Sequence, residues 1–384
     1  MGAAIVGVGQ TAYSRASGRS EWELAVEAIA AALVDCEIEP ADVDGLVRYS
    51  YDGVDEAMIA RSFGLTLRYY SQTAFGGLGS PGVLAQAYAA VASGQAKTVV
   101  CYRSLNGRSG TRYGRAERSL SADGDDLIAT GDRAPSGAFA GPYGLLSPGQ
   151  VMAMWARRYQ WEAGITQDQL VGALGRIAID QRSYAQRNPA AVMAGKPLTM
   201  AGYLAGRMIA TPLRIFDLAL ETDGAAAVVV TEGPAGPHAP VWIRAAVQGF
   251  FSYAESVAMY GELRNGPQYR ALGDRLLRDA GVRPSDIVSA SIYDATSLSV
   301  LLGLEAYGFC QPGQAWREVT EVGIGADSPV PVNTSGGHLS EAYIHGMNLV
   351  VEAVRQCRGE SVNQIERSGP ILVASGPSAV VISP

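Results

Sequence analysis

An internal repeat constrains the fold of this chain more than any other feature of its sequence. The segment Leu33–Tyr49 reads LVDCEIEPADVDGLVRY, and Leu276–Tyr293 reads LLRDAGVRPSDIVSASIY. Each contains the end of an amphipathic helix, a Pro-x-Asp turn and a strand. Glycine-rich segments follow in the same order, at residues 75–82 and 335–346, and each leads into a helix and then a strand. Two such echoes in one order predict a duplicated structural unit.

Both copies alternate helices with short, β-branched strands. This pattern indicates an α/β architecture in which helices cover the faces of a sheet. The expected strands are Ala3–Val8, Lys97–Tyr102, Ala225–Thr231, Val241–Val247 and Pro370–Ser375. We expect the two halves to divide within Gly233–Pro240, whose prolines and glycines continue neither a central strand nor a helix.

The predicted domains are therefore residues 1–235 and residues 236–384. The first contains an insertion, about residues 103–212, that the second lacks. Within it, Gln150–Tyr184 is helical by periodicity. Arg108–Ser147 is rich in glycine, serine and arginine, which is typical of a loop or lid.

Composition excludes several classes of function. The chain has 384 residues, of which 48% are hydrophobic, enough for a large core. A net charge of −7 without a basic run argues against nucleic acid as a partner. No apolar run reaches about 18 residues, so no membrane span is predicted. Met1 leads directly into an apolar strand without the charged region of an export signal, and we expect a cytoplasmic protein.

The cysteines are far apart in the sequence. There are four, Cys36, Cys101, Cys310 and Cys357, and their spacing matches neither a metal-binding pair nor a disulfide framework. A reducing compartment is the simplest environment for them. We predict no metal site and no bound cofactor.

The most informative stretch for function is Asn333–Gly346, which reads NTSGGHLSEAYIHG. It opens onto an apolar-periodic segment, Met347–Cys357, so we expect a glycine-rich turn that leads into a helix. Such a turn offers backbone N–H groups and the positive end of a helix dipole. It can hold a developing oxyanion, such as the oxygen of a thioester enolate.

This stretch resembles the Asn-x-Ser-Gly-Gly … Gly-His-Pro signature of the thiolase superfamily. Further motifs follow the order of that superfamily along essentially the whole chain: Ala3–Gly9, Thr222–Val228 and Glu305–Gly313. The last is similar to the branch that contains the sterol-carrier-protein thiolases. The resemblance implies the thiolase fold, an α/β structure of five layers made of duplicated αβαβα halves with an inserted loop domain.

The groups that a thiolase needs for catalysis are replaced. Its cysteine nucleophile belongs near the start of the helix that ends at Gly94, which places it at Gly77, give or take one residue, and no cysteine is there. The second catalytic cysteine corresponds to the sequence ASGP at residues 374–377. The thiolase histidine falls on Tyr343, and the Asn- or His-containing motif of the second half falls on Tyr293. Acyl transfer by the thiolase route therefore has no covalent step.

Tyr293 and Tyr343 are the candidate catalytic residues because both replace catalytic positions. Either can alternatively be a buried aromatic side chain with a satisfied hydroxyl group. With an ordinary pKa of about 10, a tyrosine serves as an acid or donor without a shift but needs a lowered pKa to act as a base. His345 and His338 are candidates for tuning or proton relay, and we include His345 in the predicted site. Asp294 is either an acceptor behind the tyrosines or, as we favour, a turn or cap residue.

Two further features leave alternatives open. Ser80 is either a replacement nucleophile or, as we favour, the N-cap of a helix with proline in its first position. Arginines in or beside the insertion either bind the phosphates of a CoA substrate or form surface ion pairs. They are Arg103, Arg108, Arg112, Arg115, Arg118 and Arg133.

A closer resemblance is to the lipid-transfer-type, thiolase-like family of actinobacterial steroid side-chain aldolases. The shared motifs are AAIVG at residues 3–7, SGRSE at 17–21, PADVDGL at 40–46, and Tyr102 and Arg103 before RSG at 108–110. The resemblance implies retro-aldol cleavage of a 17-hydroxy steroid acyl-CoA, a β-hydroxy thioester, to a 17-ketosteroid and propionyl-CoA. It implies Tyr343 as base and Tyr293 as donor or acid.

The resemblance also implies partners. Thiolase-fold proteins dimerise across the first-half sheet, where we place an apolar edge strand at Val99–Tyr102. The family works with a small OB-fold partner that carries a zinc-binding segment, so we expect a heterotetramer. The alternatives to a lyase are a thiolase-type acyltransferase with an unrecognised nucleophile and a non-catalytic acyl-CoA or lipid carrier.

Overall fold

A nine-stranded mixed sheet runs through both halves of the protein. The computed structural model describes residues 2–50, 52–73, 80–110, 112, 141–249 and 267–384. The strands of the sheet are β1 (Ala4–Gln10), β2 (Gly45–Tyr49), β3 (Tyr69–Thr73), β4 (Thr98–Asn106), β7 (Asp223–Thr231), β8 (Val241–Gln248), β9 (Ser289–Ile292), β10 (Ile371–Ser375) and β11 (Ser378–Ser383). Their order is β3-β2-β4-β7-β1-β8-β11-β10-β9, so the first-half strands occupy one side and the second-half strands the other. A separate pair, β5 (Met208–Ala210) and β6 (Leu213–Arg214), lies in the insertion.

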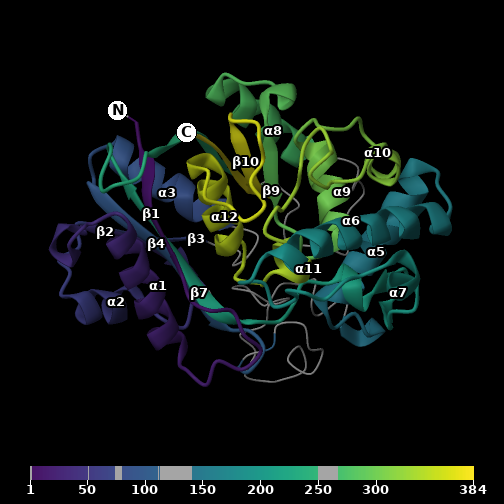
Figure 1. The fold of residues 1–384 in the computed structure, drawn as a ribbon, viewed down its shortest axis with the longest axis horizontal. Helices are drawn as coiled ribbons and strands as arrows, with labels where there is room; N and C mark the ends of the chain where they lie inside the picture. Colours follow the sequence, from purple (N-terminus) through teal and green to yellow (C-terminus); the bar gives the residue numbers. More distant parts are fainter. Residues whose placement is uncertain (1, 51, 74–79, 111, 113–140, 250–266) are drawn as a thin grey trace.

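Helices cover both faces of this sheet. The helices of the described residues, those of the inserted region included, are α1 (Glu21–Asp35), α2 (Glu56–Phe63), α3 (Ser80–Ala92), α5 (Pro148–Ala163), α6 (Gln167–Arg187), α7 (Met200–Leu204), α8 (Pro267–Ala280), α9 (Ser297–Ala306), α10 (Ala315–Glu321), α11 (Gly337–Ser340) and α12 (Met347–Arg358). α3 and α12 each contact strands from both halves, whereas α1 packs on first-half strands and α8 on second-half strands. Figure 1 shows α12 between these two groups of strands. The result is five layers, with α3 and α12 in the middle one.

The two copies of the sequence repeat form the same elements. A short 3-10 turn, η1 (Pro40–Asp42), precedes β2, and its counterpart η6 (Pro284–Asp286) precedes β9. β2 pairs in parallel with β4, just as β9 pairs in parallel with β10. The predicted duplication and its α/β architecture are confirmed. The division at residues 235 and 236 and the bounds of the insertion stay predictions.

Three local predictions need correction. The segment Val99–Tyr102 is not an edge strand, because β4 lies between β2 and β7; the first-half edge is β3. The helical stretch Gln150–Tyr184 is two helices, since Gly164 adopts a left-handed conformation (φ 66°) that ends α5. The four-residue helix α11 interrupts the expected glycine-rich turn before α12.

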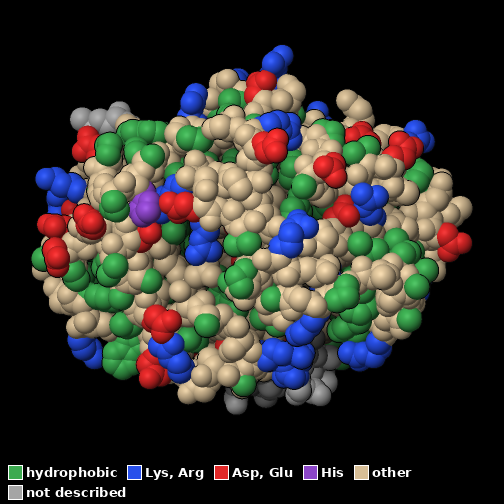
Figure 2. Space-filling model, in the orientation of Figure 1, with side chains coloured by type: hydrophobic (Ala, Val, Ile, Leu, Met, Phe, Trp, Pro, Cys, Tyr) green, Lys and Arg blue, Asp and Glu red, His purple; other side chains and the backbone are tan. Residues whose placement is uncertain are grey.

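The charged surface, the helices and the candidate CoA ligands each bear on the classes of function considered above. On the face shown in Figure 2, acidic and basic side chains are scattered among apolar ones. No helix among the described residues is long and apolar enough to cross a membrane. Of the arginines considered as CoA ligands, Arg115, Arg118 and Arg133 lie outside the described residues.

Glycines allow α1 to lie directly on the backbone of β1. A Cβ atom at Gly7 would lie 2.3 Å from the carbonyl oxygen of Ala32, and one at Gly9 would lie 2.2 Å from that of Ala28. Both distances are too short for a carbon and an oxygen atom. The position of α1 over the first-half strands therefore depends on these two glycines.

We predict that Gly7→Ala lowers the free energy of unfolding by about 1–3 kcal/mol, because α1 must move away from the strand. The matched control is Gly172→Ala within α6, where an added Cβ meets nothing within 4 Å. That change should raise stability by up to about 1 kcal/mol through helix propensity. Urea unfolding followed by circular dichroism measures both; equal midpoints for the two variants would contradict the prediction.

Candidate active site

Two tyrosines from distant parts of the chain meet at the end of the second-half sheet. The hydroxyl groups of Tyr293 and Tyr343, 50 residues apart in sequence, lie 2.6 Å apart. Tyr293 follows β9, and its backbone N–H donates to the carbonyl oxygen of Ala374 on β10 at 2.8 Å. Tyr343 lies between α11 and α12, where its N–H donates to Oγ1 of Thr222 at 2.8 Å. The structure therefore brings together the two residues that the sequence singled out.

The environments of the two tyrosines differ. Tyr293 is 6% exposed, whereas Tyr343 is half-buried. Burial, followed by the negative charge on an ionised Tyr343 and the hydrogen bond to it, raises the pKa of Tyr293 well above its ordinary value. Tyr293 therefore stays protonated and is suited to donate a hydrogen bond to Tyr343.

Two histidine rings flank this pair. The His338 ring makes edge contacts with Tyr293 and Tyr343, with ring centroids 4.8 and 5.0 Å apart. The His345 ring contacts Tyr343 in the same manner at 4.8 Å. Both histidines are buried. The predicted residue His345 thus belongs to the cluster, and so does His338.

Asp294 binds the start of α11. Its carboxylate accepts the N–H groups of His338 at 2.9 Å and Leu339 at 3.3 Å, and it lies 3.0 Å from the Nδ1 atom of His338. A carboxylate at this place satisfies the first N–H groups of a helix. These N–H groups are therefore not free to bind a substrate oxyanion. The sequence analysis had expected backbone N–H groups of this stretch to do so. Asp294 has the capping role that was one of its two interpretations.

Two glycines allow residues 337–346 to lie close to Asp294, Ser80 and Tyr293. Gly337 has φ 59°, and a Cβ atom there would lie 2.4 Å from Oδ2 of Asp294. Gly346 has φ 88°, and its Cβ would lie 2.3 Å from Oγ of Ser80 and 3.1 Å from Cδ2 of Tyr293. Ser80 is the first residue of α3 and is 2% exposed. The predicted nucleophile position, Gly77, lies outside the described residues.

A buried carboxylic acid anchors the loop between α11 and α12. Glu341 accepts hydrogen bonds from Oγ of Ser335 at 2.6 Å, Nδ2 of Asn348 at 2.8 Å and Nδ2 of Asn188 at 3.3 Å. Burial raises the pKa of Glu341 to about 7. These contacts join the loop to α6 and to the first turn of α12, and so limit the positions open to Tyr343.

The sequence analysis missed a charged pair behind the tyrosines. Arg103, on β4, has no exposed surface, and it forms an ion pair with Asp52. Its Nε atom donates to Nδ1 of His345 at 3.1 Å. A guanidinium enclosed in this way is not a surface ligand for CoA phosphates, which corrects one of the two alternatives for Arg103. The only sequence signal was an arginine inside an apolar strand; Asp52 gave none.

His345 is held in an unusual state. Burial, then Arg103 and then His338, lower the pKa of His345 well below its ordinary value. The residue also has φ 48°, a left-handed conformation that non-glycine residues seldom adopt. Its imidazole is therefore neutral and fixed in place beside Tyr343.

The cysteines contribute no thiolate to this cluster. Burial raises the pKa of Cys36 to about 11 and of Cys357 to about 12, and raises those of Cys101 and Cys310 further. Cys101, the cysteine on β4, donates from Sγ to the carbonyl oxygen of Val83 at 3.5 Å. Within the part of the chain that the structure describes, no group of three His, Cys, Asp or Glu residues is placed to hold a metal ion.

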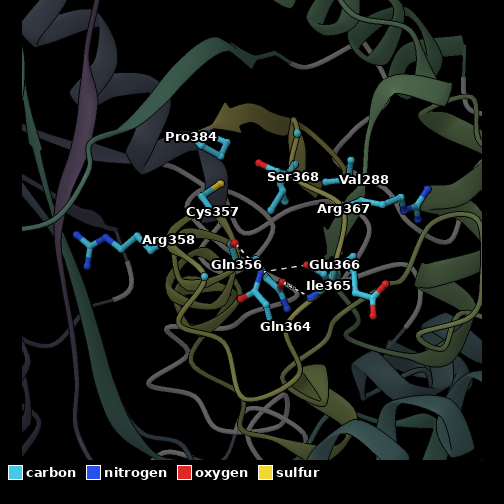
Figure 3. A pocket seen from close by; sticks show the side chains of 13 residues that line it. Val288, Gln356, Cys357, Arg358, Gln364, Ile365, Glu366, Arg367, Ser368 and Pro384 are labelled. Atoms are coloured by element: carbon cyan, nitrogen blue, oxygen red, sulfur yellow. Dashed lines mark hydrogen bonds between the residues drawn. The ribbon is translucent and has the colours of Figure 1, made fainter.

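A pocket of about 350 Å³ lies at the opposite end of α12 from the tyrosines. Figure 3 shows Gln356, Gln364 and Arg358 among the side chains that line it. Gln356 is tied there to Gln364 and Ile365 by hydrogen bonds of 3.0 and 3.1 Å. Since the pocket contains neither tyrosine nor either buried histidine, we assign the candidate active site to the tyrosine cluster instead.

Comparisons with known proteins give consistent results. The family model described as "Thiolase C-terminal domain-like" matches residues 255–376. A steroid side-chain-cleaving aldolase of Thermomonospora curvata is 40% identical over 382 residues, which cover 97% of this chain and 95% of the relative. A 17-hydroxy-3-oxo-4-pregnene-20-carboxyl-CoA lyase of Mycobacterium tuberculosis is 39% identical over 380 residues, which cover 97% and 96%.

A solved structure described as "Ltp2-ChsH2(DUF35) aldolase" superimposes with a TM-score of 0.88 at 37% identity. The match covers all of this chain and 97% of that one. The similarity thus extends over both halves of the chain.

Proposed function

The chain belongs to the thiolase superfamily, in the thiolase-like family that includes the steroid side-chain-cleaving aldolases, and from this premise we propose a retro-aldol reaction for it. The thiolase fold and the carbon–carbon lyase class predicted from the sequence are confirmed. The proposed substrate is a 17-hydroxy steroid acyl-CoA, and the products are a 17-ketosteroid and propionyl-CoA.

The observation that carries the proposal is the contact between the hydroxyl groups of Tyr293 and Tyr343 at 2.6 Å. In the reaction, a base takes the proton of the β-hydroxyl group of the substrate. The bond between the α and β carbons breaks, and its electron pair passes to the thioester as an enolate. An acid then returns a proton to the α carbon. Such a reaction needs one basic group and one acidic group in reach of the same bond.

We assign the base to Tyr343 and the donor or acid to Tyr293. Tyr343 is the more exposed of the two, which suits the group that meets substrate. The raised pKa of Tyr293 keeps it protonated, so that its hydroxyl stabilises negative charge on Tyr343 or protonates the enolate. His345 completes the site beside Tyr343.

The proposed mechanism uses no cysteine nucleophile. The thiolase nucleophile position corresponds to a glycine, and the four cysteines of the chain have raised pKa values. A buried thiol with a raised pKa is a poor nucleophile. The thioester carbonyl of the substrate is thus stabilised as an enolate and is not attacked.

We further propose that the chain forms a homodimer which binds an OB-fold, zinc-containing partner, giving a heterotetramer. Two observations support this assembly. The similar solved structure is described as a complex with a DUF35 protein. In this chain, β3 forms an edge of the sheet with Tyr70 66% exposed, and an open edge of this kind favours pairing with another chain.

Product analysis tests the proposed function directly. The chain is incubated with a 17-hydroxy steroid acyl-CoA, alone and with the DUF35 protein of the related complex, and light scattering gives the assembly state. A ketone with propionyl-CoA is expected, from a dimer or a larger assembly. A shortened acyl-CoA formed only when free CoA is added would identify an acyltransferase, and unchanged bound ligand would identify a carrier. A stable, active monomer without partner would disprove the assembly.

We predict that Tyr343→Phe and Tyr293→Phe each reduce turnover at least about 100-fold, or about 3 kcal/mol in the barrier, while acyl-CoA still binds. The change removes one hydroxyl group and keeps the ring, so packing is preserved. The matched control is Tyr159→Phe, because the buried Tyr159 donates to Glu305 at 2.7 Å, away from the cluster. That control should lose about 1–3 kcal/mol of stability and keep its turnover. If the two site variants behave like the control, the mechanism is wrong.

Replacing Cys36, Cys101, Cys310 and Cys357 together by alanine should leave turnover largely intact, because none contributes a thiolate to the site. Stopped-flow or endpoint product assays measure it, with a thermal melt to verify that the fold survives. If the quadruple variant does not fold, alkylation of the thiols in the wild-type protein tests the prediction instead. Complete inactivation by the alkylating reagent, with acyl-CoA binding and melting temperature unchanged, would show that a cysteine takes part.

A further inference from the structure

Arg103 is a charged residue without any exposed surface, at the centre of the first-half sheet. Burying an unpaired charge costs several kcal/mol, so a fully buried guanidinium requires partners that match its donors. Its Nη1 atom forms an ion pair with Asp52 and donates to the carbonyl oxygen of Ser104 at 2.7 Å. Its Nε atom donates a hydrogen bond to Nδ1 of His345, which is 242 residues away in sequence. The pair therefore links the first half of the chain to the catalytic loop of the second.

The direction of this last hydrogen bond is fixed by chemistry. A guanidinium has five N–H donors and no acceptor, and it stays charged in proteins. Nδ1 of His345, at 3.1 Å from Nε of Arg103, must therefore accept the hydrogen bond with its lone pair. In a neutral imidazole whose Nδ1 is an acceptor, the ring proton is on Nε2.

We propose that Arg103, held by Asp52, is a positioning residue that fixes His345 as the neutral tautomer with its proton on Nε2. In that tautomer His345 is a hydrogen-bond donor toward the site and is not a base. Its ring lies beside Tyr343, so the donor stabilises negative charge that develops there or on the substrate. The catalytic part of this proposal rests on the proposed function; the tautomer of His345 does not.

The surroundings of His345 support a neutral ring. The charged or titratable groups around it include Arg103 and its partner Asp52 from the first half, His338 from α11, and Tyr343, whose ring lies 4.8 Å away. Arg103 and His338 both oppose a second positive charge, and burial does the same. The left-handed backbone of His345 (φ 48°) is unfavourable for a residue with a Cβ atom and persists only where surrounding contacts impose it. The hydrogen bond from Arg103 and the ring contact with Tyr343 are contacts of this kind.

The tautomer can be measured without substrate. The chain contains three histidines, so protein labelled with ¹⁵N-histidine gives three imidazole spin systems. His238→Gln and His345→Gln variants assign the signals. For His345 we expect an unprotonated Nδ1 and a protonated Nε2 that do not change between about pH 6 and pH 8. A proton on Nδ1, or a doubly protonated ring at neutral pH, would overturn the proposal.

The effect on catalysis is measured with a charge-neutral double variant, Arg103→Gln with Asp52→Asn, which removes the buried pair as a unit. We expect His345 to lose its fixed tautomer and turnover to fall about 10- to 100-fold with little change in KM, as when other partners that orient a histidine are removed. The control removes a half-buried ion pair, Arg358→Gln with Asp35→Asn, whose atoms lie 2.8 Å apart and which does not contact His345. It should keep the wild-type turnover and the wild-type His345 signals.

Each result has a defined meaning. Wild-type turnover in a folded Arg103/Asp52 variant whose His345 signals have changed would show that the tautomer does not matter for catalysis. If that variant does not fold, Arg103→Lys replaces it, because it keeps the charge beside Asp52 and loses the planar donor group; unchanged turnover there would also overturn the catalytic part. Failure of the proposed function would give a different result. The wild-type protein would then show the expected His345 tautomer but would form neither the ketone nor propionyl-CoA.

Discussion

The closeness of two helix starts in the middle layer determines the geometry of the site. α3 begins at Ser80, α12 begins after Gly346, and the space between the two residues admits no Cβ atom. Both helices also contact strands of both halves. Because α12 is held in this way, the loop before it has little freedom, and Tyr343 must lie where it meets Tyr293 at the end of β9. Neither the hydroxyl contact nor the ring cluster would survive a shift of one helix by the width of a methyl group.

Duplication explains why such a site can be built from distant segments. The first half supplies the buried pair Arg103 and Asp52, and the second half supplies both tyrosines and both buried histidines of the cluster. Arg103 lies on β4 and Asp52 follows β2, whereas Tyr293 follows β9 and Tyr343 precedes α12. In thiolases a cysteine from the first half does the chemistry; in the mechanism proposed here the first half only orients a group of the second. Under the proposed mechanism, the same architecture serves a reaction with no covalent intermediate.

Much of the fold and the central part of the site could be predicted from the sequence. Strand and helix periodicity predicted β1, β7 and α12 to within a few residues, and the resemblance to thiolases assigned Tyr293 and Tyr343 to catalytic positions. The errors have physical causes. A helix of four residues, α11, is too short for periodicity to show. The strand order of a sheet is set by packing and not by chain order, which is why β4 was mistaken for an edge. The pairing of Arg103 with Asp52 and His345 depends on three-dimensional burial, and no local pattern in the sequence records it.

The contact between the two tyrosine hydroxyls also bears on the fate of hydrogen atoms. Retro-aldol cleavage removes one hydrogen from oxygen and delivers one to carbon, so no net hydrogen is consumed. In the proposed mechanism, two hydroxyl groups 2.6 Å apart provide both the receiver and the deliverer, with no intervening water. A hydrogen taken from the steroid can therefore be passed across the pair and placed on one face of the enolate. The site then sets the handedness of delivery to the α carbon, a property that a solvent-exposed acid would lose.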